Sequence, residues 1–167
     1  DITVLGQASG RNLSGDITCP GLGISLNDGT QLEGDITLTR ILAETNKAGL
    51  SAQGNIHAAK AAMATPAGLS ARSSVSIQGF TLTQNTKGYA MTGEVKADAL
   101  AMTFGKDQSF SGDILLKKMN VLMAGTAIQA KTDVDVKNAV INLPGTSITT
   151  EILAPDTLLT FDTGRLE

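Results

Sequence analysis

Residue types that carry chemistry are scarce in this chain of 167 residues. Cys19 is the only cysteine, so an internal disulfide cannot form. It shares the phase of Ile17, and we expect it to be a small buried hydrophobe. His57 is the only histidine, and it follows Ile56 on the polar phase of its segment, which indicates a solvated side chain. Neither residue has the surroundings of a nucleophile or a general base, so we predict no catalytic site.

The chain also lacks basic patches, stacking aromatics and long apolar runs. The net charge is −3, aromatic residues make up 3% and tryptophan is absent. This composition argues against nucleic-acid binding. No run of apolar residues is long enough to span a membrane as a helix. Hydrophobic residues make up 41% of the chain and are mostly Ala, Val, Ile, Leu and Met. Mixed with the Thr and Ser residues, they favour strands.

Glycine recurs at a regular spacing of 17 to 20 residues along the whole chain. Several of these glycines close polar turns such as NDGT, NKAG, TPAG, NTKG and LPGT. The regularly spaced glycines are Gly10, Gly29, Gly49, Gly68, Gly88, Gly105, Gly125, Gly145 and Gly164. We predict that those at turn ends, such as Gly49 and Gly88, adopt positive φ. The spacing predicts one repeat of about 19.5 residues, present roughly eight times, without a domain boundary over 1–167.

A second glycine series begins a short phrase inside each repeat. The phrase occurs in nearly identical form as LSGDIT, LEGDIT and FSGDIL. The glycine is Gly15, Gly34, Gly54, Gly93 or Gly112, with Ser73 or Ser74 in the fourth repeat. The next residue is polar, and the one after it is β-branched. Because the polar series alternates with Thr and Ser, we interpret it as part of a solvated face, and a calcium-binding nonapeptide pattern is absent.

Each repeat alternates apolar and polar residues with period two, which predicts a strand. The alternation then changes parity, as from Leu38 to Ile41 and from Ile77 to Phe80. Such a slip requires a bulge or bend if the apolar side is to keep facing inward. We therefore predict an all-β fold of about eight bent strands of roughly fifteen residues. The helix-prone stretch AAKAAMA, 58–64, is predicted to be one of these strands.

Two arrangements of the bent strands fit the period. An antiparallel, elongated sheet would form a U-shaped groove (a β-taco) with an apolar inside. A parallel β-helix with 19–20 residues per coil would enclose a packed core. The residues predicted to line the apolar inside are Leu13, Ile17, Leu32, Ile36, Leu38, Ile56, Leu69, Val75, Ile77, Met91, Val95, Phe110, Ile114, Leu116, Val134 and Val136.

A family resemblance rests on strands with the pattern L-x-G-[DEN]-[IV]-x-L. The pattern is clearest in MTGEVKADALAMTF (91–104) and FSGDILLKKMNVLM (110–123). From about Leu13 to Leu143 the chain resembles the periplasmic repeats of the AsmA-like superfamily, the TamB-like repeating β-groove proteins. The resemblance implies a bridge-like groove in the Gram-negative cell envelope that carries phospholipid acyl chains between inner and outer membranes. It implies no enzymatic activity, cofactor or metal.

The resemblance also implies partners and a location. Phospholipid acyl chains, flanking repeats of a longer chain and other envelope proteins are the expected partners, and the expected compartment is the periplasm. We expect the chain to be a fragment whose inner-membrane anchor lies outside it, with residues 166–167 typical of a vector-derived scar. The alternative is a β-helical segment of a secreted adhesin or passenger domain.

Overall fold

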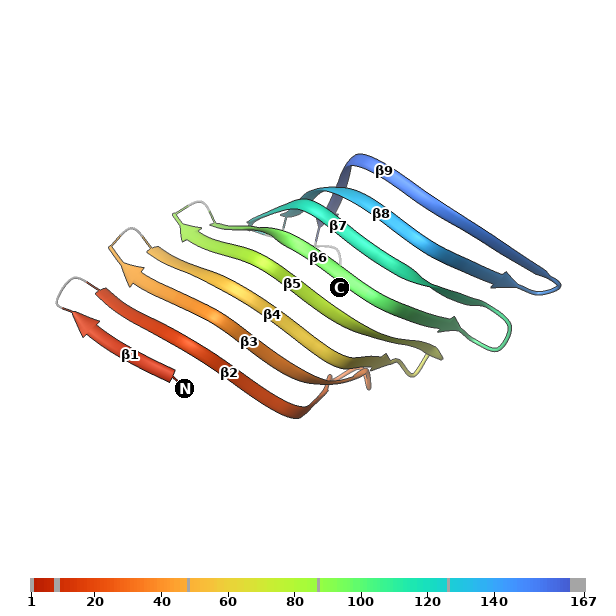
Figure 1. Cartoon of the computed structure of the whole chain (residues 1–167), viewed down its shortest axis with the longest axis horizontal. Helices are drawn as coiled ribbons and strands as arrows, with labels where there is room; N and C mark the ends of the chain where they lie inside the picture. Colours follow the sequence, from red (N-terminus) through yellow and green to blue (C-terminus); the bar gives the residue numbers. More distant parts are fainter. Residues whose placement is uncertain (1, 8–9, 48, 87, 126, 163–167) are drawn as a thin grey trace.

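The described residues form one antiparallel sheet of nine strands that follow one another in chain order (Figure 1). This computed structural model describes residues 2–7, 10–47, 49–86, 88–125 and 127–162. The strands are β1 (Ile2–Gln7), β2 (Gly10–Ser25), β3 (Gln31–Asn46), β4 (Gly49–Ala64), β5 (Leu69–Asn85), β6 (Gly88–Phe104), β7 (Ser109–Ala124), β8 (Ala127–Leu143) and β9 (Thr146–Asp162).

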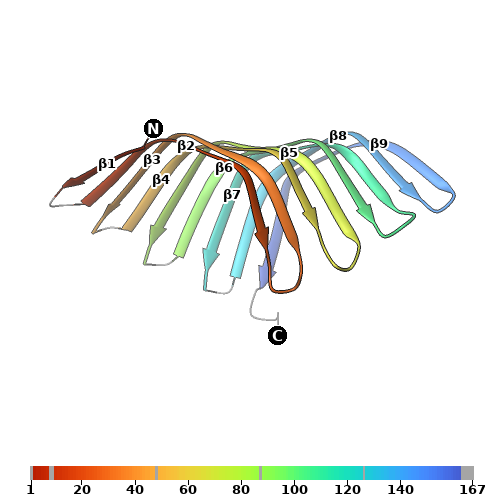
Figure 2. The same ribbon diagram turned by 90° about the horizontal axis from the view of Figure 1, so that it is seen from below.

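The prediction of bent antiparallel strands is confirmed, including β4 over the alanine-rich stretch. The alternative parallel β-helix is wrong, because every neighbouring pair of strands runs antiparallel. Short polar turns permit this direct reversal of the chain, whereas a parallel pair needs a longer crossover. Figure 2 shows the long strands bending over a common crest, with hairpins descending on both sides.

Each strand from β2 to β9 bends at one residue in the left-handed region, with φ between 51° and 63°. We call these the crease residues: Gly21, Arg40, Lys60, Gly79, Ala99, Lys118, Asn138 and Asp156. The strand pairing shifts by one residue at each of them, as a β-bulge requires. The parity changes in the sequence are therefore real bulges, and they lie at the predicted places.

The turn glycines behave as predicted at both ends of the strands. Gly49 has φ 133° and Gly88 has φ 138°, in the region where side chains are disfavoured. In the turn between β4 and β5, the N–H of Gly68 donates to the carbonyl of Thr65, and Gly68 has φ 83°. Tight turns of this kind keep successive strands in register.

Candidate apolar groove

The register places apolar side chains opposite one another across eight strands, in four apolar ladders. Directly paired residues share a face of the sheet, so each ladder is a continuous row. The ladders are Leu13–Ala43–Ala52–Leu82–Met91–Val121–Ala130–Leu159, Ile17–Leu38–Ile56–Ile77–Val95–Leu116–Val134–Ala154, Cys19–Ile36–Ala58–Val75–Ala97–Ile114–Val136–Ile152 and Ile24–Leu32–Met63–Ala71–Met102–Phe110–Ile141–Ile148.

All sixteen residues predicted to line the apolar inside lie on this one face. Fifteen of them are members of the ladders, and Leu69 lies beside them, two residues before Ala71. The prediction missed most apolar residues that follow a bulge, such as Phe80, Met119 and Ile141, and those of β9. The parity slip was the signal that could have added them, because it returns the later half of each strand to the same face.

The apolar face is the sheltered side of the sheet. Phe80, Met119, Val121, Val136 and Ala139 are at most 9% exposed, although no second layer covers them in the part of the chain that the structure describes. Only crowding by neighbouring side chains can shield residues in a single layer, and crowding is greatest on the inside of a bend. We therefore assign this face to the inside of the U, as a groove.

The groove is hollowed where β4 contributes alanines. An open hollow of about 290 Å³ lies among Ile24, Leu32, Ile36, Ala58 and Ala61. A separate hollow of about 430 Å³ lies mostly on the opposite face, between polar side chains such as Gln31, Ser70 and Thr103. The sheet is therefore indented on both faces here, and the hollow in the groove has the less polar lining of the two.

In most repeats the polar residue of the repeated phrase, here called the phrase residue, caps the crease of a neighbouring strand. The N–H of Arg40 donates to Asp16 at 2.8 Å, and the N–H of Gly21 donates to Asp35 at 2.8 Å. β2 and β3 thus cap each other reciprocally. Asn55 caps Gly79 in the same way at 2.9 Å. A short side-chain oxygen satisfies a donor that the bulge removes from the ladder.

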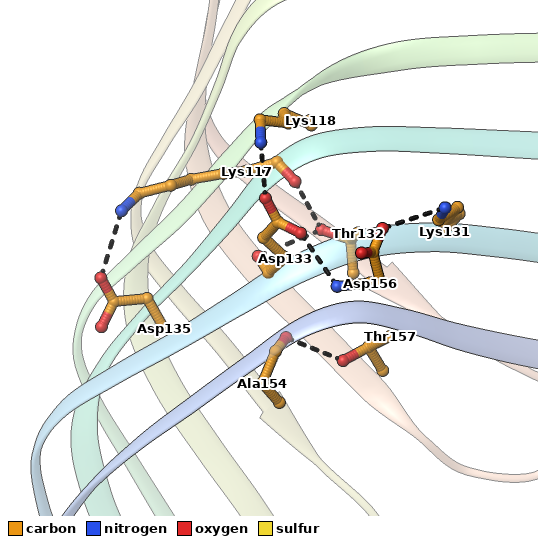
Figure 3. Close-up of polar contacts among 9 residues, drawn as sticks. All are labelled: Lys117, Lys118, Lys131, Thr132, Asp133, Asp135, Ala154, Asp156 and Thr157. Carbon is orange, nitrogen blue, oxygen red and sulfur yellow. Dashed lines mark hydrogen bonds and ion pairs between the residues drawn. The ribbon is translucent and has the colours of Figure 1, made fainter.

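Figure 3 shows the capping arrangement between β7, β8 and β9. One carboxylate oxygen of Asp133 accepts the N–H of Asp156 at 3.0 Å, and the other lies 3.0 Å from the Lys118 ammonium. Asp113 makes the same double contact, with the N–H of Ala99 and the side-chain amide of Asn138, both at 2.9 Å. The phrase residue therefore joins the crease residues of both flanking strands into one row.

These contacts lower the pKa values of the phrase carboxylates. The N–H of Gly21, and then Lys60, lower the pKa of Asp35; the N–H of Asp156, and then Lys118, lower that of Asp133. The N–H of Ala99 and the amide of Asn138 lower the pKa of Asp113. Each bond favours the charged form. The carboxylates are thus held ionised as structural caps.

The residue before the phrase residue, here called the slot, faces a neighbouring bulge. At Gly54, an added Cβ would lie 2.5 Å from Ile41 Cδ1 and 3.0 Å from the carbonyl of Thr39. Where the slot is not glycine, a hydroxyl uses the equivalent carbonyl: Ser73 donates to Asp98 at 2.9 Å, and Thr132 donates to Lys117 at 2.9 Å. The slot therefore accepts either glycine, which has no side chain, or a residue whose hydroxyl donates to this carbonyl.

Three expectations about polar residues need correction or refinement. Cys19 lies in a ladder opposite Ile36 but is exposed, so the prediction of burial is wrong. The reason is its place: β1 pairs with β2 only up to Gly15 and leaves Cys19 without a neighbour on one side. His57 is exposed on the polar face, as expected. The phrase residues cap the creases, a role that goes beyond the solvated face we expected.

Other possible sites are not evident in the described residues. No group of three His, Cys, Asp or Glu side chains among them is arranged to hold a metal ion. No helix in those same residues has the length and hydropathy to cross a membrane. Comparison with family models, curated proteins and solved structures found no match to this chain. The apolar groove is therefore the candidate site on geometry alone.

Proposed function

We propose that the chain is a non-enzymatic, lipid-carrying groove whose inner face holds phospholipid acyl chains. The observation that supports this most is the set of four unbroken apolar ladders on the sheltered face of a single-layered sheet. A soluble sheet normally buries such a face against a second layer. Here the described residues supply none, so an apolar ligand is the natural cover.

The dimensions of the ladders suit an acyl chain that lies across the strands. Eight strands spaced about 4.8 Å apart give a strip roughly 34 Å long. The hydrocarbon of one bilayer leaflet is about 15 Å thick, half of the whole core. One acyl chain therefore fits lengthwise with room to move. Each CH₂ shielded from water contributes about 0.8 kcal/mol, which offsets much of the cost of leaving a bilayer.

The chemistry of the groove favours sliding over fixed binding. The two central ladders, which contain Ile36 and Leu38, consist of aliphatic residues and Cys19, and no charged side chain interrupts them. Polar anchors fix the orientation of a ligand in an ordinary pocket. Their absence from these ladders fits a ligand that must pass along the groove.

Location and partners follow from the family resemblance and belong to the same proposal. The groove would act in the periplasm of a Gram-negative bacterium, in phospholipid transport between the membranes and in maintenance of the outer membrane. Flanking repeats would extend it, and an anchor outside this chain would hold it to the inner membrane. The adhesin alternative depended on a parallel β-helix, which the antiparallel pairing excludes.

Paired substitutions on opposite faces test the groove. Ile114 lies in a ladder, whereas the adjacent Leu115 pairs with Lys96 and Asp135 on the other face. We expect phospholipid to co-purify with the parent in native mass spectrometry; Ile114→Glu should abolish this signal, while Leu115→Glu should leave it unchanged. Because the face is open to water, Ile114→Glu should lower the free energy of unfolding by only about 1–3 kcal/mol, the value of one aliphatic side chain.

A photoreactive residue at Leu116 supplies a second readout. The parent should crosslink to phospholipid there, and Ile114→Glu should remove the crosslink while far-UV circular dichroism stays unchanged. Absence of lipid and of crosslinks in the parent, together with unfolding of Ile114→Glu, would mean that the apolar face is a covered core and would refute the groove.

A further inference from the structure

The sheet has two open edges in the residues that the structure describes. The described residues of β1 pair with β2 from Gly10 to Gly15, so residues 17–25 of β2 have no described strand on their outer side. β9 pairs with β8 on one side and has no described strand on the other. Open edges present unpaired N–H and C=O groups to any strand that can match them.

The side chains of the two edges match each other well. In the interior, β3 pairs with β4 so that Ile36 faces Ala58 and Leu38 faces Ile56. The same register between β9 of one copy and β2 of another places Ile152 opposite Cys19 and Ala154 opposite Ile17. It also places Ile148 opposite Ile24. The apolar ladders would then run from one copy into the next, so side-chain pattern alone favours head-to-tail assembly.

The backbone at the creases opposes this assembly. In interior strands the residue before the crease residue pairs with a phrase residue of the next strand, as Thr39 does with Asn55 and Lys117 with Asp133. In β2 and β9 that position holds Pro20 and Pro155. Proline has no N–H, and its ring occupies the place of the missing hydrogen.

The orientation of these prolines follows from the caps. The N–H of Asp156 points to Asp133 on β8, so in the same planar trans peptide the carbonyl of Pro155 points away from β8, toward the open edge. The nitrogen of an extended residue points to the same side as its carbonyl. The N–H of Gly21 points to Asp35 on β3, so Pro20 likewise faces outward.

We propose that Pro20 and Pro155 protect the open edges of the sheet against head-to-tail pairing with a second copy of this chain. Proline in sheets is confined to edges and bulges for this reason. The other two prolines, Pro66 and Pro144, lie in turns. In the assembly, Glu151 would face Pro20, and Pro155 would offer the second copy no N–H, so each proline removes a ladder hydrogen bond.

This protection is compatible with a groove that flanking repeats extend. A repeat tethered in the same chain has an effective concentration in the millimolar range and tolerates the loss of a hydrogen bond. A free copy at ordinary protein concentration does not have this advantage. The prolines would therefore discriminate between continuation of one chain and association of two, and the proposal stands whether or not the groove carries lipid.

The test replaces the prolines by the residues that interior strands carry at this position. Pro20→Thr with Pro155→Lys should associate at least about tenfold more tightly than the parent in sedimentation velocity over a range of concentrations. Pro66→Ala with Pro144→Ala is the matched control and should sediment like the parent. Adding Ile152→Cys to the edge variant should give disulfide-linked ladders with Cys19, because the register places the two side by side.

The outcomes separate cleanly. Concentration-dependent association of the edge variant, with ladders that Cys19→Ser removes, supports the proposal. A monomeric edge variant without ladders overturns it, and so does a parent that carries Ile152→Cys and crosslinks as readily as the variant. If the double variant does not fold by circular dichroism, each single replacement decides, because freeing one edge should already strengthen association.

Discussion

Gly54 provides the sharpest test of how a slot residue lets two strands bend together. It has φ 156°, and an added Cβ would lie 2.5 Å from Ile41 Cδ1, 3.0 Å from the carbonyl of Thr39 and 3.2 Å from that of Arg40. The first contact is with a flexible side chain, whereas the other two are with the backbone of the bulge in β3. Gly54→Ala must therefore displace a side chain and also press on the crease.

The expected cost follows from these two contributions. Forcing an extra methyl group into a filled site typically costs about 1–3 kcal/mol. A side chain in an unfavourable backbone conformation adds on the order of 1 kcal/mol or more. We expect Gly54→Ala to lower the free energy of unfolding by roughly 2–4 kcal/mol. Removing Ile41 Cδ1 by Ile41→Ala should relieve only the first contribution.

Gly23 is the matched control, because a Cβ added there meets nothing within 4 Å. Gly23→Ala should be neutral or stabilising by up to about 1 kcal/mol, since it restricts the unfolded chain. Urea denaturation followed by far-UV circular dichroism gives the stabilities, and a double-mutant cycle of Gly54→Ala with Ile41→Ala should show at least about 1 kcal/mol of favourable coupling. Equal stabilities for the two glycine variants, or no coupling to Ile41, would refute the account of the slot.

Two further predictions concern the polar contacts of the creases. Because the pKa of Asp113 is lowered in the folded state, its contribution to stability is complete above its unfolded pKa of about 3.9 and is lost as the pH falls through the lower folded value. Asp113→Asn keeps an acceptor, as Asn55 does, but does not titrate. This variant should lose less stability in acid than the parent, as measured by denaturant melts at stepped pH. Thr132 is 3% exposed and donates to the carbonyl of Lys117, so Thr132→Val should cost about 1–3 kcal/mol in urea denaturation, whereas Thr160→Val, exposed on β9, should change the midpoint little.

Much of the fold could be predicted because apolar and polar side chains alternate within each repeat. Leu32, Ile36 and Leu38 alternate with polar residues, and the parity change before Ile41 marks the bulge. The choice between a groove and a coil could not be made, because both give the same period. Strand direction depends on the turns, and the turns of a closed coil and of a meander use the same glycine-rich composition.

The capping role of the phrase residues could not be predicted from the sequence, for a different reason. Asp16 is bonded to Arg40, a residue 24 positions later, and Asp35 is bonded to Gly21, a residue 14 positions earlier. These partners become neighbours only when the strand order and direction are known. Asp133 was also missed as a phrase residue, because Thr132 occupies its slot in place of glycine.

The repeated phrase has a single geometric consequence. In the long strands that carry a phrase residue, the crease residue follows it by five positions, as Lys118 follows Asp113 and Arg40 follows Asp35. Because the strands are antiparallel, this spacing brings the phrase residue of one strand beside the crease of the next, where Asp or Asn can cap it. The bends therefore align in two rows across the sheet. A sheet whose strands bend at the same heights must curve as a whole, and the phrase thereby turns a meander of hairpins into a trough.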